Sequence, residues 1–228
     1  MVSIVIPAFN EERTIGNVIE RTAEVMDSLA LPYEIIVVDD GSTDSTRRIA
    51  SGYKATVLTN EKNCGKGCAE RKGFEQAQGD IIVTIDADGA HSPKEISGLI
   101  TPLFNGTDIT AGSRFLGRGE YKTSKLNLLG NLMFNMSIML ITGKYVTDSQ
   151  TGYRAFKREA LKKLNLESDG YDIETEITVK SLKNGFRFKE APITVNRREY
   201  SASKLRILSD GAKIFKVILK ANLAKIQH

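Results

Sequence analysis

A short apolar segment that runs directly into two carboxylates constrains this chain more than any other feature. Residues 81–85, Ile-Ile-Val-Thr-Ile, are followed at once by Asp86-Ala87-Asp88. An uninterrupted apolar run of this length predicts a strand that is buried on both faces, as in a parallel sheet. Ionised carboxylates are too costly to desolvate along such a strand, so we expect Asp86 and Asp88 at its carboxyl end.

These two acids are candidates for a divalent cation site. Open α/β sheets bind ligands at the carboxyl ends of their strands. Side chains two residues apart on an extended backbone point the same way, so Asp86 and Asp88 can reach one ion. Their hard oxygens suit Mg²⁺ or Mn²⁺, usually shared with substrate phosphates. The alternative is a polar strand end followed by an Asp-Gly turn, because Asp-x-Asp alone is a common pattern.

Strands and helices alternate through the first half of the chain. Strands are predicted at 2–7, 33–38, 55–59, 81–85 and 108–114. Helical spacing predicts helices at 11–29, 68–78 and 92–104. This alternation indicates βαβ units with right-handed crossovers, so we expect an α/β fold with a mostly parallel sheet between helices. We expect a cleft at the strand ends, lined by Glu11, Asp39, Asp40, Lys66, Asp86 and Asp88.

The second half is less regular and contains two apolar helical patterns. Residues 126–142 carry no charge, and Asn127, Asn131 and Asn135 form one polar stripe. This segment is too short and polar to span a bilayer, so we expect a helix that is buried or lies at an interface. Further elements are predicted at 151–156 (strand), 171–182 (helix) and 187–195 (strand).

The C-terminal segment 205–226 has an apolar stripe with Lys213, Lys216 and Lys220 gathered beside it. A basic amphipathic helix of this kind can lie in a membrane surface. The alternative is a helix that packs on the domain with its lysines in water. The spacing does not separate the two.

Composition narrows the classes of function. The 228 residues suit one large domain with an added terminal element, and the net charge is +4. Without a strongly basic stripe, nucleic acid is not an expected partner, whereas phosphate-bearing substrates or an anionic membrane are. Cys64 and Cys68 match no zinc spacing, so we expect free thiols in a reducing compartment. The chain begins with a strand-like run, so we expect no signal peptide.

Several segments occur in a recognisable order. In the first half these are Val5 to Glu11, Val37 to Asp44, Asn63 to Gly67 and Asp86 to Asp88. Together they resemble family-2 glycosyltransferases of the GT-A fold. Segments 112–114, 148–156 and 170–176, with Arg198 and Ser203-Lys204-Leu205, are similar to the branch of dolichyl-phosphate and polyprenyl-phosphate sugar synthases. The resemblance implies a GT-A domain at 1–204 and a separate amphipathic helix at 205–228.

The resemblance implies roles for individual residues. The nucleotide's base and ribose would be held by Pro7, Phe9, Glu11, Asp39 and Asp40. Asp86 and Asp88 would bind the Mg²⁺ or Mn²⁺ that bridges the diphosphate, with Ala87 close to the nucleotide. Phosphates of donor or acceptor would be contacted by Arg114, Arg198 and Lys204, which with Asp88 are the catalytic candidates. Lys66 either caps its glycine-rich loop or helps that loop approach the nucleotide's phosphates.

Two departures from the family pattern matter. Dolichyl-phosphate mannose synthases usually read Asp-Ala-Asp-Leu-Gln-His, with the Gln helping to coordinate the metal. Here Gly89-Ala90-His91 follows the acids, so a water or His91 would complete the metal's ligands. Segment 148–152, Asp-Ser-Gln-Thr-Gly, resembles enzymes that use UDP-glucose or UDP-GlcNAc. The donor is therefore open between GDP-mannose and a UDP-sugar.

The resemblance implies hexose transfer to dolichyl or polyprenyl phosphate with inversion, by a peripheral enzyme on the cytoplasmic face of a membrane. A phosphate acceptor is already anionic and needs no strong base; Glu174 and Glu176 are base candidates for a hydroxyl acceptor. One alternative is a family-2 enzyme with a soluble saccharide or protein acceptor. Another is a non-catalytic nucleotide-sugar binding module, if Ala90 reflects lost metal binding. A nucleotidyltransferase is disfavoured because residues 8–12, after the first strand, are not glycine-rich.

Overall fold

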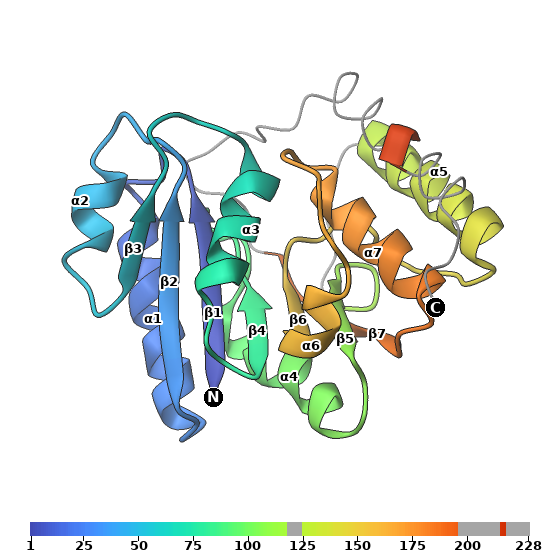
Figure 1. Ribbon diagram of the computed structural model, residues 1–228, viewed down its shortest axis with the longest axis horizontal. Helices are drawn as coiled ribbons and strands as arrows, with labels where there is room; N and C mark the ends of the chain where they lie inside the picture. Colours follow the sequence, from blue (N-terminus) through green and yellow to red (C-terminus); the bar gives the residue numbers. More distant parts are fainter. Residues whose placement is uncertain (118–124, 196–214, 218–228) are drawn as a thin grey trace.

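The computed structural model describes residues 1–117, 125–195 and 215–217 (Figure 1). Arg198, Lys204 and most of the helix predicted at 205–226 lie outside these residues, so those predictions stay untested. Within them, no helix has both the length and the apolar character needed to cross a bilayer.

Seven strands form one mixed sheet, in the order β3-β2-β1-β4-β6-β5-β7. Their bounds are β1 Val2–Ala8, β2 Tyr33–Asp39, β3 Thr56–Thr59, β4 Ile81–Thr84, β5 Ile109–Ser113, β6 Arg154–Lys157 and β7 Phe188–Pro192. All neighbouring pairs are parallel except those of β6, which runs antiparallel to β4 and β5. The predicted α/β fold with a mostly parallel sheet is confirmed; the antiparallel insertion of β6 was not predicted.

Helices cover both faces of the sheet (Figure 1). They are α1 Ile15–Ser28, α2 Thr46–Ala50, α3 Lys66–Gln76, α4 Ile96–Phe104, α5 Lys125–Thr142, α6 Arg158–Lys162 and α7 Ile173–Lys183; a 3₁₀ turn, Pro93–Glu95, precedes α4. Alternate residues of β1 face opposite layers: Ile4 and Ile6 belong to the core with α1 and α4, and Val5 to the core with α3, α6 and α7. Burial on both faces explains why these strands are apolar throughout.

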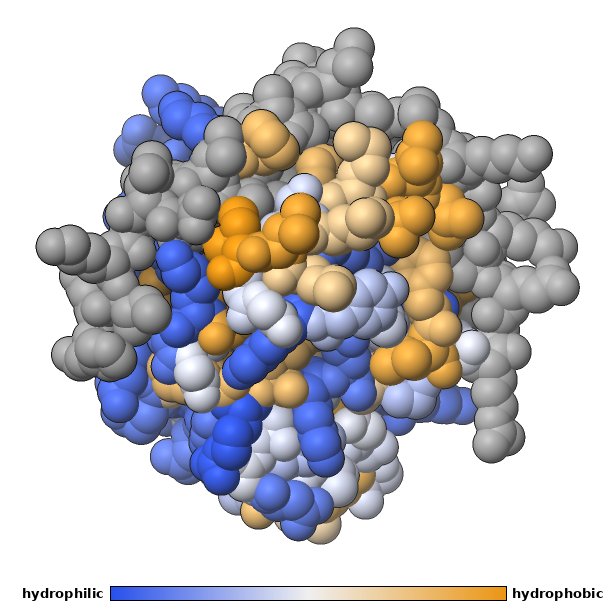
Figure 2. All heavy atoms as spheres, turned by 90° about the vertical axis from the view of Figure 1, so that its right-hand side faces the viewer, coloured by the Kyte–Doolittle hydropathy of each residue, from blue (hydrophilic) through white to orange (hydrophobic). Residues whose placement is uncertain are grey.

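Helix α5 is oriented with Asn131 and Asn135 inward. Asn135 is buried; its Nδ2 donates to the Thr147 carbonyl (2.8 Å), and its Oδ1 accepts from the Ser149 N–H (3.3 Å). The opposite side of α5 exposes a row of large apolar side chains, which Figure 2 shows as a hydrophobic patch: Leu128, Leu129, Leu132, Met133, Met136, Met139 and Leu140. Of the two placements predicted for this helix, the one at an interface matches this exposure.

The expectation of free thiols is wrong. Cys64 and Cys68 form a disulfide, with Cα atoms 5.9 Å apart. Helix α3 begins at Lys66, two residues earlier than predicted, so Cys64 lies just before the helix and Cys68 in its first turn. Residues four apart at a helix start are neighbours, which is why this spacing can close a disulfide.

The packing of α3 against β1 depends on Gly73. A Cβ at this position would clash with the Val5 side chain, which is fully buried. We expect Gly73→Ala to lower the free energy of unfolding by about 1–3 kcal/mol through overpacking. Gly98→Ala in α4 is the control: nothing lies within 4 Å of its added Cβ, so stability should stay equal or rise slightly. Urea unfolding measures both, and equal effects would contradict this account.

Candidate functional site

The loops that follow β1 and β2 are tied together at the carboxyl edge of the sheet. The Asn10 N–H donates to Ser42 Oγ (2.9 Å), and the Glu11 N–H donates to Thr46 Oγ1 (2.7 Å). The Thr43 N–H in turn donates to Asn10 Oδ1 (2.8 Å). These bonds bring the segments of Pro7, Phe9 and Glu11, predicted to hold the nucleotide, beside that of Asp39 and Asp40.

Asp39 and Asp40 are both buried and accept hydrogen bonds from nearby loops. Asp39 accepts from the Ser42 N–H (3.3 Å). Asp40 accepts from the Cys64 N–H (3.0 Å) and the Gly65 N–H (2.8 Å), one on each carboxylate oxygen. Asp40 therefore fixes the glycine-rich loop in place, a role that the sequence did not predict.

Lys66, the first residue of α3, joins three carboxylates. Its Nζ lies 2.7 Å from Asp86 Oδ1 and 2.6 Å from Glu174 Oε1, and Glu70 Oε1 is 3.8 Å away. A Cβ at Gly152 would clash with Lys66 Nζ, so this glycine makes room for the cluster. The predicted cleft residues Lys66 and Asp86 do converge, and Glu70 and Glu174 join them.

Burial and the neighbouring charges together set the pKa values of the groups in this cluster. Burial alone would lower the pKa of Lys66, but the charges of Asp86, Glu174 and Glu70 outweigh it and raise that pKa well above its usual value. Burial raises the pKa of Glu70 to about 8 and also raises the pKa of Glu174. One ammonium does not balance three carboxylates, so Glu70 keeps its proton at neutral pH.

His91 lies beside the two acids and is almost entirely buried. Its Nε2 is 3.7 Å from Asp86 Oδ2, and its ring stacks at 5.1 Å, between centroids, on Tyr153. Burial lowers the pKa of His91, so the ring is neutral at pH 7. Its buried Nδ1 receives no hydrogen bond from the described residues. The nitrogen that faces Asp86 is Nε2, and a neutral imidazole is able to act as a metal ligand.

The donor set fits a divalent cation that is shared with a substrate. Asp86 and Asp88 supply carboxylate oxygens and His91 an imidazole; buried Ala90 offers no side-chain ligand, and its N–H donates to Asp88 Oδ1 (3.0 Å). Over residues 1–117, 125–195 and 215–217, no three such side chains converge into a preformed metal cage. Mg²⁺ and its relatives typically take one or two carboxylates and complete their shell with phosphate oxygens and water.

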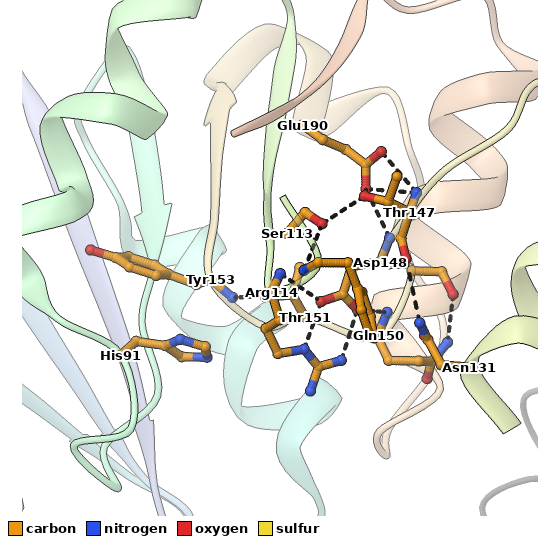
Figure 3. Close-up of polar contacts among 12 residues, drawn as sticks. His91, Ser113, Arg114, Asn131, Thr147, Asp148, Gln150, Thr151, Tyr153 and Glu190 are labelled. Atoms are coloured by element: carbon orange, nitrogen blue, oxygen red, sulfur yellow. Dashed lines mark hydrogen bonds and ion pairs between the residues drawn. The ribbon is translucent and has the colours of Figure 1, made fainter. Parts of the chain in front are cut away.

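Arg114 is held as a fork by a buried carboxylate (Figure 3). Its Nε and Nη2 donate to the two oxygens of Asp148, at 2.6 and 2.7 Å. Glu190 on β7 holds the backbone of Asp148 in turn, because it accepts the N–H groups of Thr147 and Asp148, each at 2.8 Å. Figure 3 shows the His91 ring on the side of Arg114 that faces Tyr153. The planar Arg114 group is thus held in place by Asp148, and its charge acts on the His91 ring.

Glu174 and Glu176 have different surroundings, whereas the sequence did not distinguish them as base candidates. The Glu176 carboxylate accepts the N–H groups of Glu167 (3.0 Å) and Ser168 (2.8 Å), so it holds a loop. Glu174 faces Lys66 instead. The sequence reasoning missed Glu70 and Glu190. Glu70 lies four residues after Lys66, a spacing that could have revealed it; nothing in the sequence pattern pointed to Glu190.

Comparisons with known proteins agree with this geometry. The family model described as "Glycosyl transferase family 2" matches residues 3–165. The chain is 34% identical to the UDP-N-acetylglucosamine–dolichyl-phosphate N-acetylglucosaminyltransferase of Methanococcus voltae, over 99% of this chain and 98% of that protein. It is 30% identical to the polyprenol monophosphomannose synthase of Mycolicibacterium smegmatis, over 94% of this chain and 84% of that protein.

The fold is shared with a solved glycosyltransferase structure. Glucosyl-3-phosphoglycerate synthase from Mycobacterium tuberculosis, crystallised with Mn²⁺, UDP and phosphoglyceric acid, superposes with a TM-score of 0.78. The sequences are 22% identical, and the match covers 99% of this chain and 79% of that one. This likeness confirms the predicted GT-A architecture.

The raised pKa of Glu70 predicts how stability depends on pH. Between the ordinary value of 4.5 and about 8, the folded protein holds a proton on Glu70 that the unfolded chain releases. Stability from this group therefore falls as pH rises through that window. In Glu70→Gln, the loss of unfolding free energy between pH 5.5 and 8 should be smaller by about 1 kcal/mol or more. Glu75→Gln, exposed on the same helix, should follow the unmodified protein in urea unfolding; an unchanged slope in Glu70→Gln would refute the assignment.

Proposed function

The chain belongs to glycosyltransferase family 2, and on that premise we propose that it moves a hexose from a nucleotide-diphosphate sugar to a polyprenyl phosphate such as dolichyl phosphate, with inversion. The observation that carries the proposal is the pairing of opposite charges around His91. Asp86 and Asp88, suited to a cation on a diphosphate, and the guanidinium of Arg114, anchored by Asp148, are all close enough for their charges to act on His91, and Asp86 Oδ2 is 3.7 Å from His91 Nε2. Two relatives matched over nearly the whole chain are named for dolichyl or polyprenol phosphate chemistry.

The reaction exchanges one anomeric bond for another. A phosphate oxygen of the acceptor bonds to the sugar's anomeric carbon as the bond to the donor's diphosphate breaks. Bound Mg²⁺ or Mn²⁺ would neutralise the charge that develops on the departing nucleoside diphosphate. The residues of the chain hold the two anions in line: Asp86 and Asp88 at the donor, and Arg114 near the acceptor.

The state of Glu174 favours a phosphate acceptor over a hydroxyl acceptor. A hydroxyl must lose its proton to a positioned base, and Glu174 is 3% exposed with one oxygen on Lys66. Glu176 is occupied by the loop at 167–168. A polyprenyl phosphate is anionic near neutral pH and needs positive charge instead, which Arg114 offers. Arg198 and Lys204 are proposed to add to it; Val195, three residues before Arg198, pairs with His91.

The exposed face of α5 supports a peripheral contact with the membrane that carries the lipid acceptor. Its apolar side chains lie side by side on one face of the molecule (Figure 2), and Leu140 is 84% exposed. A patch of this kind gains free energy when it enters the boundary between headgroups and acyl chains. We place the enzyme on the cytoplasmic leaflet, where nucleotide sugars are available.

Transfer is tested with vesicles that contain polyprenyl phosphate, a panel of labelled GDP- and UDP-sugars, and extraction of the lipid product. The panel also identifies the donor. Asp88→Ala should lower transfer by about a hundredfold or more, because the donor's diphosphate loses its cation site. Asp80→Asn, an exposed acid just before β4, is the matched control and should keep full activity. Undiminished transfer in a folded Asp88→Ala protein would exclude the metal role of Asp88.

Membrane contact is tested by flotation with the same vesicles. Replacing Leu129, Met133 and Leu140 together by Ser should weaken vesicle binding by about tenfold or more, since three apolar side chains no longer enter the bilayer. These side chains are exposed, so the melting temperature should hold. Phe104→Ser, which removes an exposed apolar side chain on α4, should bind vesicles normally. If the triple variant floats like the unmodified protein, α5 is not the contact surface.

A further inference from the structure

Lys66 lies where it competes with a divalent cation for Asp86. We propose that Lys66 is a built-in counter-ion of Asp86, and that a divalent ion takes Asp86 Oδ1 as a ligand only by displacing the Lys66 ammonium group onto Glu174. The inference builds on the metal-assisted transfer proposed above and assigns Lys66 a positioning role within it.

The ion pair between Lys66 and Asp86 occupies one oxygen of that carboxylate. Lys66 Nζ is 2.7 Å from Asp86 Oδ1, within the distance of a direct ion pair, so a cation cannot approach that oxygen while the ammonium stays there. Two positive charges at one carboxylate oxygen repel each other, and the repulsion is strong where water is scarce; the Lys66 side chain is 12% exposed. Binding of an ion to Oδ1, or to both oxygens of Asp86, therefore requires Lys66 to move, whereas Oδ2 faces His91.

Glu174 offers a place for the displaced ammonium. Glu174 already accepts from Lys66 through Oε1 at 2.6 Å, and its other oxygen, Oε2, is buried without a hydrogen bond from any residue that the structure describes. Such an orphaned buried acceptor is costly and needs a reason. A small shift of Nζ away from Asp86 would satisfy both oxygens of Glu174.

Asp86 does not need Lys66 as a partner, because it is partly exposed to water. The Asp86 side chain is 22% exposed, so water can solvate it. Glu174 is nearly inaccessible and depends far more on the ammonium. The buried Arg154 does not replace it, because its Nε and Nη2 donate to the Thr151 and Ser149 carbonyls and its Nη1 to Thr178 Oγ1. The pair with Asp86 is thus the one that the cluster can give up.

This arrangement makes ion binding conditional on the donor. Without nucleotide, the ion gains few protein ligands and must first displace Lys66, so its affinity is low. A diphosphate supplies further oxygen ligands and offsets that cost. The site is therefore expected to take the ion together with the nucleotide sugar.

The test is Mn²⁺ binding to the full chain without nucleotide, with free Mn²⁺ followed by electron paramagnetic resonance. Lys66→Met keeps the aliphatic stem and removes the competitor, so Mn²⁺ should bind about tenfold or more tightly than to the unmodified protein. Lys72→Met is the matched control: Lys72 is on the same helix and donates to the Thr59 carbonyl and Asn60 Oδ1. It should leave Mn²⁺ affinity unchanged. Equal or weaker binding by folded Lys66→Met overturns the proposal.

A second measurement does not depend on that variant folding, and it separates displacement from simple charge effects. A crystal structure of the unmodified protein with Mn²⁺ and UDP should show Lys66 Nζ detached from Asp86 and bonded to both oxygens of Glu174. Lys66 still paired with Asp86 beside a bound Mn²⁺ overturns the proposal. Sugar transfer is measured separately. Displacement of Lys66 without transfer rejects the proposed function alone, and Lys66 still paired with Asp86 beside bound Mn²⁺ in a protein that transfers sugar to polyprenyl phosphate rejects this inference alone.

Discussion

The ammonium of Lys66 is the interaction on which the site depends. It connects Asp86, which follows β4, to Glu70 on α3 and Glu174 on α7, and so links the parallel half of the sheet to the part of the chain that follows β6. Gly152, just before β6, makes room for it. Buried charges persist only when they are partnered, so the relative position of these elements is specified by this one group.

A second set of polar contacts holds Arg114 in position. Glu190 on β7 holds Thr147 and Asp148, Asp148 holds Arg114, and Asn135 of α5 bonds the same loop from the other side. Because Asn131 and Asn135 face inward, the apolar side of α5 is left exposed. One helix thus supports the arginine and presents a hydrophobic surface on the outside (Figure 2).

Most of the sheet could be predicted because its strands are buried on both faces. Segments such as 2–7 and 81–85 carry no polar alternation, and their length and order left few topologies. The β6 strand was harder, since an antiparallel strand inserted between β4 and β5 has no local signature. The disulfide of Cys64 and Cys68 was also missed: it depends on α3 beginning at Lys66, and helix boundaries are poorly set by propensity.

By itself the sequence determined the α/β class, the place of Asp86 and Asp88 at a strand end and, through ordered motifs, the family. These follow from desolvation and local spacing, which act within a few residues along the chain. It takes the packed fold to show which carboxylate faces Lys66, that Glu176 holds a loop, that Asp148 clamps Arg114 and which side of α5 is exposed. Those outcomes depend on contacts between residues that are distant in sequence, and no local pattern encodes the direction in which a side chain points once the elements pack.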